Sequence, residues 1–390
     1  MKRRQLLQLL ALGASAPLGL SLMNQALADS ASLSSRKLIL IELAGANDGL
    51  NTLVPMKNDF YFQYRPGIAL SKNEVTNLDD QFSMHQSLNP LMKYWEQGSM
   101  AWVHGLGYPA PNRSHFKSIS LWETGGDGNR DGKQGWVTHD IEHRLGRSIN
   151  DAHGISMVGD MNLFRSDSGR WLSMSSPEQF LDERQPVSMK TSNVNRSLTL
   201  VTQRMAELEE SLYGLSSKLE NSPGTRRLPG GTLGAQLQQV LRMIRAKIDT
   251  PVFRVQLDGF DTHENQPYRH RNLLDQLGKA LAAFATELQK DGEWNNTLIM
   301  TYSEFGRRAK ENRSGGTDHG TAAPHMILGG KINGGLFGNP TDLAKLDATG
   351  DPHYTMDYRA LYNRVLNQWF DIPQNTFSAW PDRRLDRLIG

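Results

Sequence analysis

Residues 37–43 read K-L-I-L-I-E-L, a nearly continuous apolar run. The run is preceded by S-S-R at 34–36 and followed by the turn A-G-A-N-D-G at 44–49. Uninterrupted apolar runs are typical of strands that are buried on both faces, whereas half-exposed strands alternate apolar and polar residues. We therefore expect these residues to form a central strand of a sheet that helices cover on both sides.

Beyond this strand, the sequence alternates further strands with helices. Turn residues and apolar runs predict strands at 100–104, 251–257, 297–302 and 326–328. Apolar residues at helical spacing predict a helix that starts near Ser114 and others at 198–219, 233–248, 273–288 and about 356–370. Such alternation favours an α/β fold with a mostly parallel central sheet sandwiched by helices. Residues 125–190 are rich in Gly, Asp, Asn and Ser, and we interpret them as a loop-rich excursion.

The first 28 residues are typical of a targeting signal. A basic start with Lys2, Arg3 and Arg4 precedes a modestly apolar stretch at 6–23, and A-L-A at 26–28 is a small-x-small cleavage site. The adjacent arginines favour a twin-arginine signal, read by the twin-arginine translocase, with the mature chain at 29–390 in the periplasm. An ordinary secretory signal and an uncleaved anchor are the alternatives.

Charge and composition exclude several classes of protein. Three of the 43 basic residues and none of the 41 acidic residues lie in 1–28, so residues 29–390 carry a formal charge of −1 rather than the +2 of the whole chain. This balance gives no electrostatic footprint for nucleic acid. No other apolar run is long enough for a stable membrane span. The chain has no Cys, so catalysis or metal binding must use His, carboxylates and hydroxyls.

Polar side chains follow every predicted strand, where ligands bind in open α/β sheets. They lie at 47–48, 112–115, 258–263 and 303–308, with a further group in the loop 315–320. Carboxylates and imidazoles bind divalent ions, which neutralise substrate oxygens and lower the pKa of a bound water. The candidate metal ligands are Asp48, Asp261, His263, Glu304, Asp318 and His319, and the ion could be zinc, calcium or manganese.

Each candidate also has a structural interpretation. Asp48 lies where a helix N-cap would lie. Glu304 ends an apolar strand, where it could instead form a salt bridge with Arg307 or Arg308. Ser114 could be an N-cap or a nucleophile at a helix N-terminus. Arg113 is a candidate for gripping an anionic substrate group. We expect His104, His115 and His325 to contact the ligands rather than the ion.

Five sequence blocks resemble a known family. They are L-I-E-L-A-G-A-N-D-G-L-N-T at 40–52, G-Y-P-A-P-N-R-S-H-F at 107–116, G-F-D-T-H-E-N-Q at 259–266, S-E-F-G-R-R at 303–308 and G-T-D-H-G-T-A at 316–322. In this order they are similar to the bacterial domain-of-unknown-function family 1501, whose members typically carry twin-arginine signals. That family is grouped with the alkaline phosphatase and sulfatase superfamily, so the resemblance implies a single alkaline-phosphatase-like domain at 29–390.

The resemblance also implies roles for particular residues. Asp48, Asp261, His263 and His319 match metal ligands of the superfamily, and Ser114 matches its nucleophile. Phe305 stands where a second metal would have a ligand, which favours one ion or a weakened pair. Ser114 lacks the C/S-x-P-x-R context of sulfatases that use formylglycine.

Two functions are therefore expected. The first is a periplasmic metal-dependent hydrolase of a phosphate or sulfate ester, acting on a small anionic substrate. The alternative is a non-catalytic binding or envelope-assembly protein that retains a degenerate site. The sequence names neither the substrate nor a partner protein.

Overall fold

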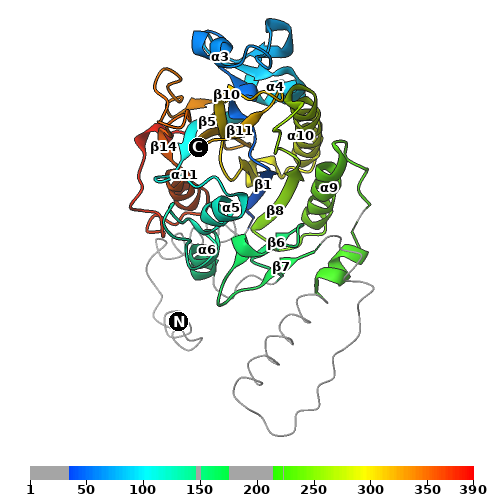
Figure 1. The fold of residues 1–390 in the computed structure, drawn as a ribbon. Helices are drawn as coiled ribbons and strands as arrows, with labels where there is room; N and C mark the ends of the chain where they lie inside the picture. Colours follow the sequence, from blue (N-terminus) through cyan, green and yellow to red (C-terminus); the bar gives the residue numbers. More distant parts are fainter. Residues whose placement is uncertain (1–34, 146–150, 175–213, 223) are drawn as a thin grey trace, which may run out of the picture.

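A mostly parallel sheet forms the centre of the computed structural model, which describes residues 35–145, 151–174, 214–222 and 224–390 (Figure 1). Within these residues the sheet has nine strands in the order β13-β5-β12-β9-β1-β8-β6-β7, and β14 pairs with β5. The strands are β1 (Lys37–Ala44), β5 (Met100–Gly107), β6 (Gly154–Ser156), β7 (Trp171–Ser173), β8 (Val252–Asp258), β9 (Thr297–Tyr302), β12 (Ala323–Gly329), β13 (Gly335–Phe337) and β14 (Met356–Asp357).

The apolar run at 37–43 is the centre of this sheet, as predicted. β1 pairs in parallel with β8 on one side and with β9 on the other. Ile39, Ile41 and Leu43 pack into one hydrophobic cluster, and Leu38 and Leu40 pack into a second cluster on the opposite face. The near-continuous apolar sequence is thus explained by burial on both faces.

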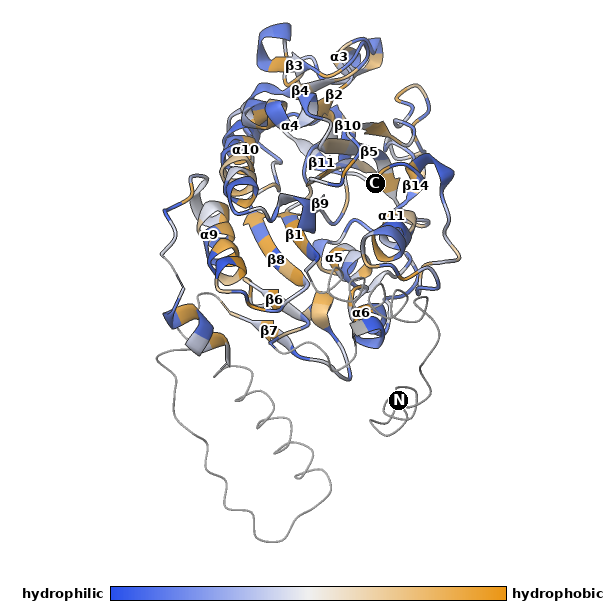
Figure 2. Cartoon of the chain, turned by 180° about the vertical axis from the view of Figure 1, so that it is seen from behind, coloured by the Kyte–Doolittle hydropathy of each residue, from blue (hydrophilic) through white to orange (hydrophobic). Residues whose placement is uncertain are grey.

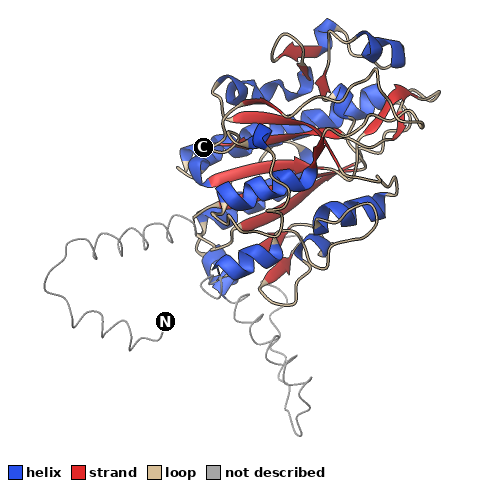
Figure 3. Ribbon diagram, turned by 90° about the vertical axis from the view of Figure 1, so that its left-hand side faces the viewer, coloured by secondary structure: helices blue, strands red, loops and turns tan. Residues whose placement is uncertain are grey.

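Helices cover both faces of the sheet (Figures 1 and 3). The first cluster contains α9 (Gly231–Arg245) and α10 (Gln266–Lys290). The second contains α5 (His115–Thr124), α6 (Thr138–Leu145) and α11 (Tyr358–Arg364). Figure 2 shows the resulting layers, with hydrophobic strands β1 and β8 between helices that present hydrophilic residues outward. The predicted fold class is confirmed.

Two smaller sheets lie beside the central one. β2 (Leu53–Val54), β4 (Ser83–His85) and β3 (Val75–Asn77) form one, near α3 (Asp59–Tyr64) and α4 (Met92–Glu96). β10 (Arg307–Glu311) and β11 (Thr317–His319) form an antiparallel hairpin. The short 3-10 helices are η1 (Gly49–Asn51), η2 (Lys72–Glu74), η3 (Gln86–Leu91), η5 (Asn162–Phe164), η6 (Trp294–Asn296) and η8 (Arg383–Leu385).

The structure refines several predicted elements. The apolar run at 326–328 is the middle of β12, which runs antiparallel to both β5 and β9. The last helix begins at Tyr358 and continues as a π-helix at η7 (Val365–Trp369). The described part of 125–190 contributes α6 and also β6 and β7 at one edge of the sheet. The predicted signal and most of the predicted helix at 198–219 lie outside the described residues.

A buried ion cluster fastens α5 to the sheet. The Arg254 guanidinium of β8 lies 2.7 Å from Glu42 of β1 and 2.6 Å from Glu123 of α5. All three side chains are buried, and burial raises the pKa of Glu123 to about 7. Removing one member of such a cluster would leave an uncompensated charge, so the cluster holds α5 in one position on the sheet.

None of the helices in the described part of the chain has the length and apolar character needed to cross a bilayer.

Candidate metal centre

The candidate site lies where β1, β8 and β9 end. The loop after β8 carries Asp261 and His263, and Glu304 follows β9. His319 ends β11, and His115 is the first residue of α5. Segments that are far apart in the sequence therefore deliver these side chains to one edge of the sheet, as strand-end reasoning predicts.

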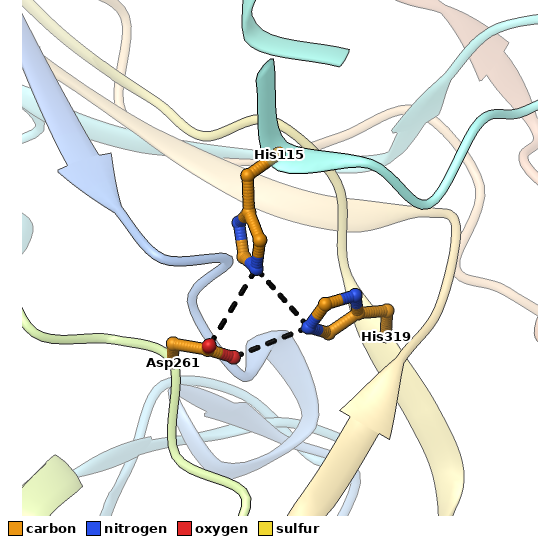
Figure 4. Close-up of side chains that lie close together, drawn as sticks. All are labelled: His115, Asp261 and His319. Atoms are coloured by element: carbon orange, nitrogen blue, oxygen red, sulfur yellow. Dashed lines mark hydrogen bonds and ion pairs between the residues drawn. The ribbon is translucent and has the colours of Figure 1, made fainter. Parts of the chain in front are cut away.

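Three of these side chains converge on one point (Figure 4). The Nε2 atoms of His115 and His319 are 3.1 Å apart. Asp261 Oδ1 lies 3.2 Å from His319 Nε2, and Oδ2 lies 3.6 Å from His115 Nε2. One ligand atom from each residue lies within 4.8 Å of the others, which is the spacing of a site that could hold a metal ion.

His263 joins the same group from the loop before α10. Its Nε2 lies 2.9 Å from His319 Nε2 and 3.0 Å from Asp261 Oδ1. The four side chains are between about a quarter and a half exposed, so the cluster is open to solvent and to a substrate. We refer to His115, Asp261, His263 and His319 as the histidine cluster.

The outer nitrogen of each imidazole faces a hydrogen-bond acceptor. His115 Nδ1 lies 2.7 Å from Glu304 Oε1, and His263 Nδ1 lies 3.2 Å from Asp318 Oδ1. His319 Nδ1 lies 2.9 Å from the backbone carbonyl oxygen of Arg113. An ionised carboxylate or a carbonyl can only accept, so we assign the proton of each ring to Nδ1.

This assignment leaves the Nε2 lone pair of His319 facing those of His115 and His263, beside a carboxylate. Lone pairs at 2.9–3.1 Å repel unless a positive charge lies between them, either a proton on one ring or a metal ion. Imidazoles oriented from behind by carboxylates or carbonyls are the usual arrangement around a bound metal. The donor set therefore fits a divalent cation.

The charges around the cluster also favour a cation. The hydrogen bond to Glu304 raises the pKa of His115 above its usual value. Burial alone would raise the pKa of Glu304, but the hydrogen bonds from His115 and from the Gly45 amide lower it. Burial would likewise raise the pKa of Asp261, and the Arg307 guanidinium lowers it. Both carboxyl groups are thus ionised at neutral pH, and Glu304 makes His115 a stronger donor to a metal.

Arg307 holds the loops of the site together. Its fully buried guanidinium donates to Asp261 Oδ1 at 2.5 Å. It also donates to carbonyl oxygens of the turn after β1, of the loop after β8 and of β11, namely Gly45, Ala46, Phe260 and Thr317. Gly45 has φ +104°, and a Cβ there would lie 2.4 Å from the backbone nitrogen of Asp261, so only glycine permits this close approach.

Phe305 separates the cluster from any second site. Its ring centroid lies 5.0 Å from that of His115 and 4.9 Å from that of His319. A phenyl ring offers no ligand atom, so the space beside these two histidines is filled by an apolar wall. The geometry fits one ion better than two.

Ser114 occupies the N-cap position of α5 without capping it. Its backbone has φ −84° and ψ 124°, and its side chain makes no cap hydrogen bond. The residue is exposed and directly precedes His115. The hydroxyl therefore has no capping role and lies at the positive end of a helix.

The guanidinium of Arg113 binds side chains of the protein itself, whereas we predicted from the sequence that it would grip an anionic substrate group. Its guanidinium lies against Asp351 and donates to Thr349 Oγ1 at 2.6 Å, with Asp347 at 3.7 Å. An anion would have to compete with these two carboxylates for it. The contact that links Arg113 to the cluster is its carbonyl oxygen, which orients His319.

The structure places Asp48 away from the histidine cluster. Both of its oxygens are held by Arg65, at 2.5 and 3.0 Å, in a fully buried ion pair. Gln266 donates to the same carboxylate, and Asp48 caps η1 by accepting from Leu50 N at 3.1 Å. No oxygen is left for an ion, so the N-cap interpretation replaces the predicted metal ligand.

Three of the six predicted ligands lie in the cluster itself, namely Asp261, His263 and His319. Glu304 and Asp318 contact outer nitrogens of histidines, and the salt bridge predicted as the alternative for Glu304 is not what the structure shows. His115 was expected only as a supporting residue, yet its Nε2 lies among the ligand atoms. The feature of the sequence that could have identified His115 as a ligand is its position as the first residue of the helix that follows a strand.

Comparisons with known proteins agree with the sequence blocks. The family model described as "Protein of unknown function (DUF1501)" matches residues 35–378. The chain belongs to this family. Among curated proteins, none matches this chain.

Solved structures show distant similarity. The lipoteichoic acid synthase LtaP from Listeria monocytogenes is 9% identical with a TM-score of 0.37, over 78% of this chain and 68% of that chain. An alkaline phosphatase superfamily protein from Vibrio parahaemolyticus is 12% identical with a TM-score of 0.35, over 82% and 71%. The C-terminal periplasmic domain of EcEptC from Escherichia coli, in complex with Zn, is 8% identical with a TM-score of 0.36, over 88% and 84%. With TM-scores below 0.5, we take the chemistry from this chain's own residues.

Mutation can test whether the buried Asp48–Arg65 pair stabilises the fold. Burial alone would raise the pKa of Asp48, and Arg65 lowers it below its usual value. The pair thus stabilises the fold at neutral pH, and this contribution is lost as the pH falls through the folded-state pKa. We expect Arg65→Met to lower the free energy of unfolding by about 3–5 kcal/mol at pH 7, because it leaves a buried carboxylate unpaired.

This deficit should shrink when urea unfolding is repeated at lower pH, since protonation removes the unpaired charge in the variant. Lys279→Met is the matched control, because it breaks an exposed pair with Asp275 at 2.7 Å and should change stability by less than about 1 kcal/mol. Equal effects of the two variants would show that the Asp48–Arg65 pair is not a structural anchor.

Proposed function

We propose that this protein is a periplasmic, metal-dependent hydrolase of a phosphate or sulfate ester. The observation that carries the proposal is the convergence of His115, Asp261 and His319 on a solvent-accessible point, with His263 Nε2 beside His319 and Asp261. His115, Asp261, His263 and His319 would hold one divalent ion, with Glu304 and Asp318 as the partners that orient two of the histidines.

The donor set narrows the choice of metal. Calcium prefers six to eight oxygen ligands, whereas imidazole suits zinc and other transition metals. A donor set rich in imidazole therefore supports zinc over calcium and manganese. When bound, such an ion supplies a Lewis acid that polarises a substrate oxygen and lowers the pKa of a coordinated water or hydroxyl.

The surrounding residues support ester hydrolysis. The Ser114 hydroxyl makes no cap hydrogen bond, and it lies at the N-terminus of α5, where backbone N–H groups and the helix dipole stabilise a developing negative charge. It is the residue best placed to act as nucleophile toward a phosphorus or sulfur centre. The partly exposed cluster gives a small anionic ester access from solvent.

Export in a folded state is consistent with this chemistry. The motif Arg3-Arg4 and the A-L-A site at 26–28 support a twin-arginine signal. A protein that folds around a cytoplasmic metal ion would need a translocase that carries folded chains. The non-catalytic binding or envelope-assembly protein remains the alternative that the experiments below distinguish.

The metal is tested by elemental analysis. We expect about one equivalent of zinc per purified chain. Asp318→Ala should weaken metal affinity by about 10–100-fold in a calorimetric titration, because it removes the carboxylate that orients His263. His353→Ala, at an exposed histidine outside the cluster, is the control and should bind metal normally. A well-folded protein that takes up no ion would refute the metal centre.

Catalysis is tested with 4-nitrophenyl phosphate and 4-nitrophenyl sulfate. Metal-loaded protein should hydrolyse at least one ester, and Ser114→Ala should lower kcat on the order of 10³-fold or more while the metal stays bound. Ser120→Ala, in the same helix but more than one turn beyond its N-terminus, controls for effects on α5. Loaded protein that hydrolyses neither ester would favour the non-catalytic alternative.

Export is tested by replacing Arg3→Lys and Arg4→Lys together. The paired arginines are the part of the signal that the twin-arginine translocase reads, so we expect the double variant to accumulate in the cytoplasm with its signal uncleaved. Cell fractionation and immunoblotting measure the distribution. Normal periplasmic amounts of the double variant would point to the ordinary secretory route.

A further inference from the structure

A separate pocket lies between η1, α3 and the loop 340–344. Its volume is about 540 Å³, within the usual range of small-molecule sites. Arg307 lines this pocket and also binds Asp261 of the histidine cluster. The pocket and the candidate metal centre therefore share a structural residue, but no member of the histidine cluster lines the pocket.

The walls of the pocket are mostly apolar. Leucine, phenylalanine and four proline residues contribute to them, including Leu53, Phe82, Pro324 and Pro340. Proline rings are rigid and phenyl rings are rigid and flat, so together they offer a preformed apolar surface on which a flat, apolar group can pack. The charged residues at the rim, Lys57, Asp59 and Asp342, are exposed and carry both signs. The rim thus gives no preference for a charged ligand.

One buried polar side chain in the pocket has no partner. His104 is 5% exposed and lines the pocket, and no hydrogen bond of its ring nitrogens is found among the described residues. Its ring packs on Phe82 with centroids 4.6 Å apart. Burial lowers the pKa of His104 to about 4, so the ring is neutral at pH 7 and offers one donor and one acceptor nitrogen.

The ring nitrogens of His104 are not among the fully buried polar atoms that lack a partner, so they are accessible from the pocket, where a ligand or water can complete their hydrogen bonds. A charged ligand would lose its hydration in this pocket without compensation, because the Arg307 guanidinium is already bonded to Asp261 and four carbonyl oxygens and the imidazole of His104 is neutral. A neutral ring that carries a hydroxyl can pack on the proline and phenyl surfaces and donate its O–H to the unprotonated nitrogen of His104.

We propose that this pocket binds a neutral, planar hydroxyaromatic molecule, with His104 as the hydrogen-bonding residue. The site stands independently of the proposed hydrolase, because it rests on the pocket and on His104 rather than on the histidine cluster. Binding can therefore be measured with metal-free protein, and its outcome does not depend on whether the chain is an enzyme.

The test compares 2-naphthol with naphthalene, which lacks the hydroxyl, in fluorescence titrations of the full chain. We expect 2-naphthol to bind about fivefold more tightly than naphthalene, the ratio that one neutral hydrogen bond gives. His104→Phe should remove this difference while it keeps a ring against Phe82. Equal affinities of the two compounds for the unchanged protein would overturn the proposal.

Two matched variants locate the binding. Ala344 is exposed and lines the pocket, so Ala344→Trp should block it and weaken both compounds by at least about tenfold. Ala348 is also exposed but lies in a different hollow, so Ala348→Trp should leave binding unchanged. Circular dichroism melting curves establish that each variant folds. Undiminished binding by folded Ala344→Trp protein would likewise overturn the proposal.

Discussion

The guanidinium of Arg307 is the interaction on which the rest of the site depends. It is fully buried, and it bonds the Asp261 carboxylate together with four backbone carbonyl oxygens from three separate segments. A buried cation needs such a set of acceptors, and the acceptors in turn fix the segments that carry them. The loop with Asp261 and His263 and the strand that ends at His319 are thereby held at a fixed distance from the turn after β1.

Much of the fold could be predicted from hydrophobic patterning alone. The strands at 37–43 and 297–302 were placed to within about a residue of β1 and β9, because both are buried on two faces and have continuous apolar sequences. The direction of β12 could not be predicted, since an apolar run such as 326–328 looks the same in a parallel and in an antiparallel strand. That direction depends on the path of the preceding hairpin, which local sequence does not record.

The site was predicted at the level of the sheet edge but not at the level of individual contacts. Strand ends brought Asp261, His263 and His319 together as expected. Glu304 contacts His115 of the cluster but does not belong to the cluster itself. The sequence could not show this difference, because a metal ligand and a residue that orients a ligand can both be a carboxylate at a strand end. Asp48 differs because Arg65, seventeen positions later, covers both of its oxygens. Such pairings depend on how loops pack, and loop packing leaves no periodic trace in sequence.

The antiparallel course of β12 has a consequence for how the protein is made. The chain reaches the site through the hairpin β10–β11 and only then enters β12, so His319 is the last of the four cluster residues to be synthesised. A ribosome must therefore translate and release the chain as far as His319 before all four side chains of the cluster exist. The cluster can come together only after β1, α5 and β8 have been made, so it is a late product of chain synthesis.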